Sequence, residues 1–266
     1  MSKKAIILGG SGFLGSALCA ETKKRGWEVI SVNHSDYPKC AGMSCDVLIN
    51  ADGNSKKYLA DQDPNLDFDL SVRSVSLSLH DIKAGLYVCL SSIDVYSNKN
   101  NPSCNHEDSI LSHDKISSYG FNKFIAEQII SRNAKSWLIF RLGGFVGSGL
   151  KKNSIYDMLK NQPLRVHPDS RYQYMDTGVM AEIALQMIET GPKKAIFNLT
   201  GEGIISMKDI ARLIPGNPLA GAPVDQIPEY YEVNNSKIKM YTKIPSTRKT
   251  VEQFVKDVLS GAVKLS

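Results

Sequence analysis

The stretch KAIILGGSGFLG, residues 4–15, determines how the rest of the chain can be interpreted. It opens with a short apolar run, which is typical of a β-strand buried on both faces. Gly9, Gly12 and Gly15 then follow at intervals of three residues. Residues 13–25 have a helical pattern, and a glycine comes directly after them. The stretch therefore predicts a strand, a glycine-rich turn and a helix in direct succession.

Glycine at these positions allows a tight turn and lets the backbone approach a pyrophosphate closely. The N-terminus of the helix that follows presents free N–H groups and a partial positive charge to such an anion. A glycine-rich turn without a ligand is the alternative, but the flanking strand and helix are the context that a dinucleotide site requires. The expected cofactor contacts are Gly9, Gly10, Ser11, Gly12, Phe13, Leu14 and Gly15.

Strand-like and helix-like segments alternate along the rest of the chain, which is typical of a parallel sheet flanked by helices. Strands are expected at residues 27–33, 45–50, 86–91, 137–142 and 195–200, and helices at 65–82, 117–134, 153–161, 177–190, 206–214 and 247–259. Only about a dozen residues separate the second strand from the third, so one strand–helix unit is expected to be trimmed there.

The expected fold is an α/β, Rossmann-type, doubly wound parallel sheet with a small C-terminal substrate lobe. Residues 1–150 would form the dinucleotide-binding core. Residues 151–266 would complete the sheet and form the reduced substrate-binding lobe, without a clean domain boundary.

Composition argues against several classes of protein. The 266 residues carry a net charge of +5, with no run of five Lys or Arg residues, so no nucleic acid partner is expected. The apolar run near the N-terminus is too short for a signal sequence, and no segment approaches the length of a membrane span. We therefore expect a cytoplasmic protein that does not bind membranes. The five cysteines include no CxxC pair, which argues against a disulfide framework and a metal site.

The second predicted strand ends in Asn33-His34-Ser35, where NAD-selective sites usually carry an acidic residue that binds the ribose hydroxyls. A carboxylate would repel a 2′-phosphate, so its absence favours NADP while NAD stays open. Asn33, His34 and Ser35 are therefore expected cofactor contacts, and loop residues without such a contact are the alternative.

Tyr119 and Lys123 form a YxxxK spacing in the predicted helix over residues 117–134. Residues four apart share a helix face, so both side chains can reach one site. Free tyrosine ionises only near pH 10, about three units above neutral, but an adjacent ammonium and a nicotinamide cation favour the phenolate. Such a tyrosine can exchange a proton with a substrate hydroxyl or carbonyl. An exposed pair is the alternative, because the spacing is common.

A third element is LSSIDVY, residues 90–96, at the end of a predicted buried strand. Open α/β sheets bind ligands at the carboxyl ends of their strands. A serine at this place can hold a substrate oxygen while Tyr119 moves its proton.

The glycine turn, the SSxxVY segment and the YxxxK helix, in this order, resemble the extended short-chain dehydrogenase/reductase superfamily. More narrowly, the chain resembles the NAD-dependent epimerase/dehydratase family, whose members act on nucleotide sugars. Two later segments, Arg141-Leu142-Gly143 and residues 197–201 (FNLTG), resemble further strands of that family.

The resemblance implies that Ser92 is the hydroxyl partner, Tyr119 the general acid/base and Lys123 the lysine that binds the cofactor ribose. Asp94 lies where some members carry an acid/base group, so it is a fourth catalytic candidate; an aspartate that caps the turn is the equal alternative. Dehydratases of the family pair two acids after a threonine, and Ile93 occupies one of those places here. Dehydration is therefore disfavoured.

The resemblance also implies backbone contacts to the cofactor from Ala51 and Gly53, and substrate diphosphate contacts from Arg171 and Arg165. Each of these has a plain alternative, a turn or an exposed arginine. In this family the helix equivalent to residues 117–134 often packs against a second subunit, so the resemblance also implies a homodimer.

The expected function is that of an NAD(P)-dependent oxidoreductase, a ketoreductase or epimerase acting on a nucleotide-linked sugar. A non-catalytic NAD(P)-sensing protein of the same fold is the alternative. Such proteins usually lose the tyrosine or the lysine of the YxxxK pair, and both are present here.

Overall fold

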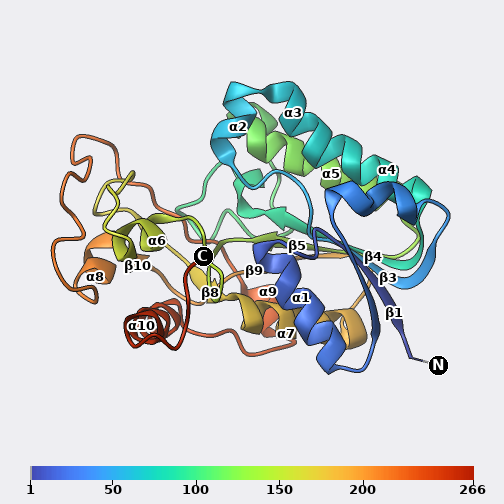
Figure 1. Ribbon diagram of the computed structural model, residues 1–266. Coiled ribbons are helices and arrows are strands. Elements are labelled where there is room, and N and C mark those ends of the chain that lie inside the picture. The colour runs from blue at the N-terminus through green and yellow to red at the C-terminus, as the bar shows by residue number, and fades with distance from the viewer. Residues whose placement is uncertain (1) are drawn as a thin grey trace. The chain divides into compact units, whose positions relative to one another are not determined.

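The computed structural model describes residues 2–266 (Figure 1). These residues form two compact units that are interleaved along the chain. The first, here called the sheet unit, comprises the chain up to Ser97, Glu107–Leu142 and Ala181–Asn198. The second unit comprises Asn98–His106, Gly143–Met180 and Leu199–Ser266.

The sheet unit is built on a six-stranded sheet with the order β2-β1-β3-β4-β5-β9. Its strands are β1 (Lys4–Leu8), β2 (Glu28–Val32), β3 (Ser44–Asn50), β4 (Lys83–Ser92), β5 (Trp137–Leu142) and β9 (Ala195–Leu199). The pairs from β2 through β5 are all parallel. The Rossmann-type α/β fold expected from the sequence is therefore confirmed.

The connection between β2 and β3 is shortened, as predicted. A 3-10 turn, η1 (His34–Cys40), occupies the place where a full helix and a further strand would otherwise lie. The chain runs from β1 to β2 on one side and then returns to β3 on the other side of β1. This reversal is the topological switch point, where sheets of this kind bind ligands.

Helices cover both faces of this sheet. Figure 1 shows α1 (Phe13–Lys24) and the later part of α7 (Thr177–Thr190) on one face. The other face carries α2 (Lys57–Gln62), α3 (Pro64–Phe68), α4 (Ser74–Asp81) and α5 (Ser118–Asn133). A π-turn, Asp69–Arg73, joins α3 to α4, so the helix predicted over residues 65–82 is nearly continuous. No helix within residues 2–266 is long and apolar enough to cross a membrane.

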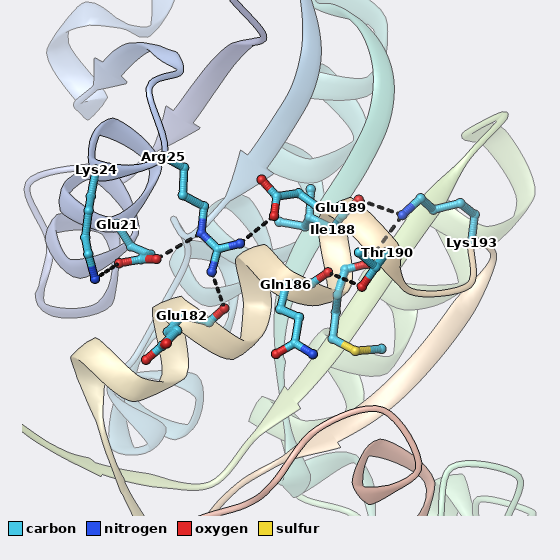
Figure 2. Close-up of polar contacts among 10 residues, drawn as sticks. Glu21, Lys24, Arg25, Glu182, Gln186, Ile188, Glu189, Thr190 and Lys193 are labelled. Carbon is cyan, nitrogen blue, oxygen red and sulfur yellow. Dashed lines mark hydrogen bonds and ion pairs between the residues drawn. The ribbon is translucent and has the colours of Figure 1, made fainter.

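Arg25, directly after α1, links that helix to α7 through hydrogen bonds and an ion pair (Figure 2). Its Nε donates to Glu21 Oε1 at 2.9 Å, and its Nη2 donates to the backbone oxygen of Glu182 at 3.1 Å. Its Nη1 forms an ion pair with Glu189. One guanidinium therefore binds groups from two helices, which holds them on the same face of the sheet.

The core of the sheet unit explains why α5 has a fixed position. Ala126 and Ile130, on one face of α5, pack in a cluster with Tyr87 of β4 and Ile139 of β5. All four side chains are buried. This apolar contact fixes α5 against the centre of the sheet, and the N-terminal end of the same helix carries Tyr119 and Lys123.

The second unit consists of short elements. Its strands form two pairs, β6–β8 parallel and β10–β7 antiparallel. The elements are β6 (Gly144–Val146), α6 (Ser154–Leu159), β7 (Arg171–Tyr172), β8 (Tyr174–Asp176), β10 (Ile205–Ser206), α8 (Met207–Ala211), α9 (Ser236–Lys239) and α10 (Thr247–Leu259). The helices had been predicted except for α9. The strands had not, because two or three residues are too few to show an alternating pattern.

Candidate active site

The glycine turn lies at the switch point of the sheet. Gly9 N and Gly10 N both donate to the backbone oxygen of Val32, the last residue of β2, at 2.8 and 3.4 Å. Gly9 has φ of 70°, a conformation that favours glycine. A Cβ on Gly9 would lie 2.9 Å from the backbone oxygen of Ala51, directly after β3. The turn therefore runs close to the ends of three neighbouring strands.

The last glycine of the motif allows helix α1 to pack closely on the turn. A Cβ on Gly15 would lie only 2.1 Å from the backbone oxygen of Gly9. Gly12, the N-cap of α1, makes no side-chain capping bond. The first N–H groups of the helix are thus left to bind another acceptor, as an anion site at a helix N-terminus requires. These residues fit the pyrophosphate of a dinucleotide.

Asn33 follows β2 and is linked to the glycine turn. Ser11 Oγ donates to Asn33 Oδ1 at 2.5 Å. Asn33, His34 and Ser35 are all exposed, so their side chains are accessible to a ligand. Lys39, a basic residue of the same turn, pairs with Asp36 at 2.8 Å.

The segment after β3 connects the glycine turn to the YxxxK helix. Buried Asn50 holds this segment, because its Oδ1 accepts from Asp52 N at 3.0 Å. Gly53 has φ of 117°, and a Cβ there would lie 3.1 Å from Lys123 Nζ. The Lys123 ammonium therefore lies beside Gly53, on the side of the sheet where the sequence predicts the cofactor. Ala51 and Gly53 are both partly exposed.

Tyr119 and Lys123 share one face of α5, as their spacing predicts. Ser117 caps the helix by accepting from Gly120 N at 3.2 Å. Both side chains are buried, and Lys123 Nζ lies 5.5 Å from the centre of the Tyr119 ring. The pair is therefore buried and not exposed at the surface.

Gly120 brings this helix close to the turn that follows β4. That turn is a 3-10 helix, η3 (Ile93–Val95), which begins after Ser92. A Cβ on Gly120 would lie 2.1 Å from the backbone oxygen of Asp94. The absence of a side chain at Gly120 therefore lets the backbone of α5 lie against the turn that carries Ser92 and Asp94. Tyr119 directly precedes Gly120 in the sequence.

Ser92 and Asp94 are hydrogen-bonded to each other. Ser92 Oγ donates to Asp94 Oδ2 at 3.0 Å and accepts from Asp94 N at 3.1 Å. Both residues are buried. Lys57, at the start of α2, places its Nζ 2.9 Å from Asp94 Oδ1. Lys57 is not among the residues predicted from the sequence, because nothing in a polar loop indicates that its side chain meets a residue 37 positions later.

A buried polar network that the sequence analysis also missed lies next to these residues. Ser91 Oγ donates to Glu127 Oε1 at 2.5 Å, and Arg141 Nη2 donates to Glu127 Oε2 at 2.7 Å. Arg141 Nη1 donates to Tyr96 OH at 2.9 Å, and Tyr96 OH donates to Asn198 Oδ1 at 2.9 Å. Burial raises the pKa of Tyr96 to about 12, so it stays a neutral phenol here.

This network explains the arrangement of the two serines. Ser91 and Ser92 are neighbours at the end of a strand, so their side chains point to opposite faces. Ser91 binds Glu127, one turn of α5 beyond Lys123. Ser92 instead caps the turn beside Gly120, and its role as the hydroxyl partner stays a prediction.

The two arginines proposed as substrate contacts lie in the second unit. Arg171 is exposed on β7, where its backbone N–H donates to Glu229 O at 2.8 Å. Arg165 is exposed before that strand. Both cations are accessible to an anionic ligand, and their assignment to a diphosphate stays a prediction.

The parallel sheet, the glycine turn at its switch point and the buried Tyr–Lys pair together define a Rossmann-type protein of the short-chain dehydrogenase/reductase kind. The chain belongs to the family described as the RmlD substrate binding domain, whose model matches residues 3–258. This match confirms the superfamily that the three motifs indicated. No curated protein sequence matches the chain.

Several solved structures share the fold. One is a dTDP-4-dehydrorhamnose reductase from Bacillus anthracis in complex with NADP, with a TM-score of 0.77 at 16% identity. Another is a UDP-galactose 4-epimerase, with a TM-score of 0.78 at 19% identity. A third is MoeE5 in complex with UDP-glucose and NAD, with a TM-score of 0.81 at 13% identity. Each comparison covers 97% of this chain and 99% of the other.

Proposed function

We propose that this chain is an NAD(P)-dependent oxidoreductase that acts on a nucleotide-linked sugar as a ketoreductase or epimerase. The observation that carries the proposal is the buried Tyr119–Lys123 pair on α5, with its ammonium beside Gly53 and its helix against the turn of Ser92. Neighbouring structures with NADP, NAD and UDP-sugars support the same cofactor and substrate classes.

The residues of the switch point are proposed to bind the cofactor. Gly9 to Gly15 and the N-terminus of α1 would hold the pyrophosphate, and Ala51 and Gly53 would contact the dinucleotide through their backbone. When bound, the cofactor supplies or accepts a hydride at a sugar carbon. The exposed amide of Asn33 carries no charge to repel a 2′-phosphate, which supports NADP.

The chain's own residues would handle the proton. Tyr119 would exchange a proton with the sugar oxygen, and the Lys123 ammonium would stabilise its phenolate and bind the ribose. Ser92 would donate a hydrogen bond to the same sugar oxygen and so align it. Asp94 is bonded to Ser92, which supports a role in orienting that hydroxyl more than direct protonation of the sugar. Arg165 and Arg171 are proposed as contacts of the diphosphate, because guanidinium groups suit phosphate oxygens.

A homodimer is part of the proposal. Large apolar side chains are exposed on the helices of one face of the sheet unit, namely Leu66, Phe68, Leu77 and Phe121. Phe121 belongs to α5, the helix for which the sequence analysis predicted a subunit contact. Association through this face would remove these side chains from water.

The test combines ligand binding with one substitution. Ligands that bind only the folded protein raise its melting temperature, so NADP, NAD, UDP-glucose and UDP-glucuronic acid are compared in a thermal-shift panel. With the sugar and cofactor that bind, Tyr119→Phe should lower kcat by about 100- to 10,000-fold, because it removes the proton donor. Tyr58→Phe, at an exposed tyrosine of α2, is the matched control and should keep near-native kcat.

Two results would contradict the proposal. Near-native turnover by Tyr119→Phe would remove Tyr119 from its role as general acid/base. A wild-type protein that binds the cofactor but converts no nucleotide sugar would instead favour the sensing protein.

A further inference from the structure

Lys57 and Asp94 form an ion pair in which one partner is buried and the other is accessible. Lys57 Nζ lies 2.9 Å from both Asp94 Oδ1 and Asp94 Oδ2. The Asp94 side chain is 4% exposed and that of Lys57 54% exposed. A carboxylate taken out of water needs an opposite charge or hydrogen bonds. Lys57 supplies such a charge from the solvent side.

The pair continues to Ser92. Its hydroxyl donates to Asp94 Oδ2 and accepts from Asp94 N. A hydroxyl has one proton to donate, so the proton of Ser92 is directed at Asp94 in this arrangement. To align a substrate oxygen, the hydroxyl must turn this proton away from the carboxylate. The strength of the Ser92–Asp94 hydrogen bond therefore determines how readily the hydroxyl turns toward the substrate oxygen.

The backbone directly before Lys57 is linked by hydrogen bonds to the YxxxK helix. Asn54 Oδ1 accepts from Lys56 N at 2.7 Å, which ties the start of α2 to a buried side chain. Asn54 Nδ2 donates to Asp67 Oδ1 at 2.7 Å, and Asn122 Nδ2 of α5 donates to Asp67 Oδ2 at 2.6 Å. These hydrogen bonds through Asp67 therefore fix the position of the start of α2 relative to α5.

We propose that Lys57 is a positioning residue for Ser92 that acts through Asp94. The ammonium neutralises part of the carboxylate charge, so Asp94 orients the Ser92 hydroxyl without preventing its rotation to the substrate oxygen. Without Lys57, the full charge of Asp94 competes with the substrate for the same proton. This inference rests on the proposed function and adds to it a residue outside the YxxxK and SSxxVY motifs.

The ion pair is tested first, without substrate or cofactor. The protein is treated with a limiting amount of an amine-acetylating reagent, and mass spectrometry measures the rate at each lysine. Lys56 is the internal control, because it is the exposed neighbour of Lys57. Only the neutral amine reacts, so Lys57 should react several-fold more slowly than Lys56 in the wild-type protein and at a similar rate in Asp94→Asn. Equal rates in both proteins would overturn the inference.

The positioning role is then tested by kinetics with the nucleotide sugar that the panel identifies. Lys57→Met should lower kcat about tenfold with little change in KM, because Ser92 is misdirected while binding contacts remain. Lys57→Arg should retain most of the activity, and Lys56→Met should match the wild type. In a Ser92→Ala background, Lys57→Met should have less than about a twofold effect, because the group it positions is absent.

The outcomes separate the two proposals. If Lys57→Met lowers kcat equally in both backgrounds, or behaves like Lys56→Met, the positioning role is wrong while the enzyme activity stands. If the wild-type protein converts none of the sugars, the proposed function fails and the catalytic role of Lys57 fails with it. In that case the acetylation rates still show whether Lys57 holds Asp94.

Discussion

The glycine turn and the side-chain cluster around Ser92 are two parts of one candidate site, and they are constructed differently. The turn uses backbone atoms from one continuous stretch, and its demands are steric: a Cβ at Gly15 would overlap the backbone of Gly9. The cluster uses side chains of Lys57, Asp94 and Tyr119, which come from separate elements. A backbone site can be recognised locally in a sequence, whereas a side-chain cluster depends on how distant elements pack.

The buried polar network beside the side-chain cluster should lose more stability from one substitution than the glycine turn does. Arg141→Met would leave Glu127, which is fully buried, without the guanidinium that now binds both of its oxygens. Breaking a buried ion pair in this way costs about 3–5 kcal/mol. Urea denaturation of the variant should show a loss of unfolding free energy of about this size.

Arg25→Met is the matched control for Arg141→Met. Arg25 also bridges elements of the sheet unit, but its side chain is 22% exposed and that of its partner Glu189 is 27% exposed. Water can reach both groups after the substitution, so a loss of about 1 kcal/mol or less is expected. If the two variants lose equal stability, burial is not what makes the network beside the serines sensitive.

The backbone part is tested by adding one methyl group. In Gly15→Ala the new Cβ would meet the backbone of Gly9, which can move only if the turn opens. Overpacking of this kind costs about 1–3 kcal/mol, and the displaced turn should also bind the dinucleotide more weakly. Thermal unfolding with and without NADP measures both effects.

Gly26→Ala separates strain from damage to the cofactor site. Gly26 has φ of 77°, and no other atom of residues 2–266 apart from its chain neighbours lies within 4 Å of a Cβ built there, so alanine adds backbone strain without a clash. A stability loss of about 1 kcal/mol is expected, with cofactor binding unchanged. If both glycine variants bind NADP like the wild type, the close packing of α1 on the turn is structural only.

The contrast between a continuous backbone turn and a cluster of distant side chains also explains which parts of the structure could be predicted from the sequence. The strands of the sheet are short apolar runs and the helices α1, α7 and α10 have an apolar face, so their presence and approximate bounds were predictable. Tyr119 and Lys123 were found because both lie on one helix. Lys57 was missed because its partner Asp94 is remote in sequence, and the ends of α2 carry no capping signal. Arg141 was noted only for its likeness to a family strand, since sequence gives no sign that Glu127 reaches it.

The choice between NADP and NAD is where backbone and side-chain recognition meet, and it should show the smallest effect. Asn33 extends from the end of β2, and its Oδ1 accepts from Ser11 Oγ in the glycine turn. In Asn33→Asp a carboxylate oxygen can accept the same bond, so the turn should keep its shape. The added charge repels a 2′-phosphate and can bind ribose hydroxyls instead. The ratio of NADP affinity to NAD affinity should fall about tenfold, or about 1.4 kcal/mol, in fluorescence titrations of the two reduced cofactors.

Asn33→Ala distinguishes charge from the loss of the Ser11 bond. Alanine removes the hydrogen bond without adding a charge, so it should weaken both cofactors alike and leave their ratio nearly unchanged. An unchanged ratio in Asn33→Asp would mean that Asn33 does not meet the ribose. Cofactor choice would then depend on other side chains near the turn, and the shortened η1 segment, which carries His34 and Ser35, is the next place to substitute.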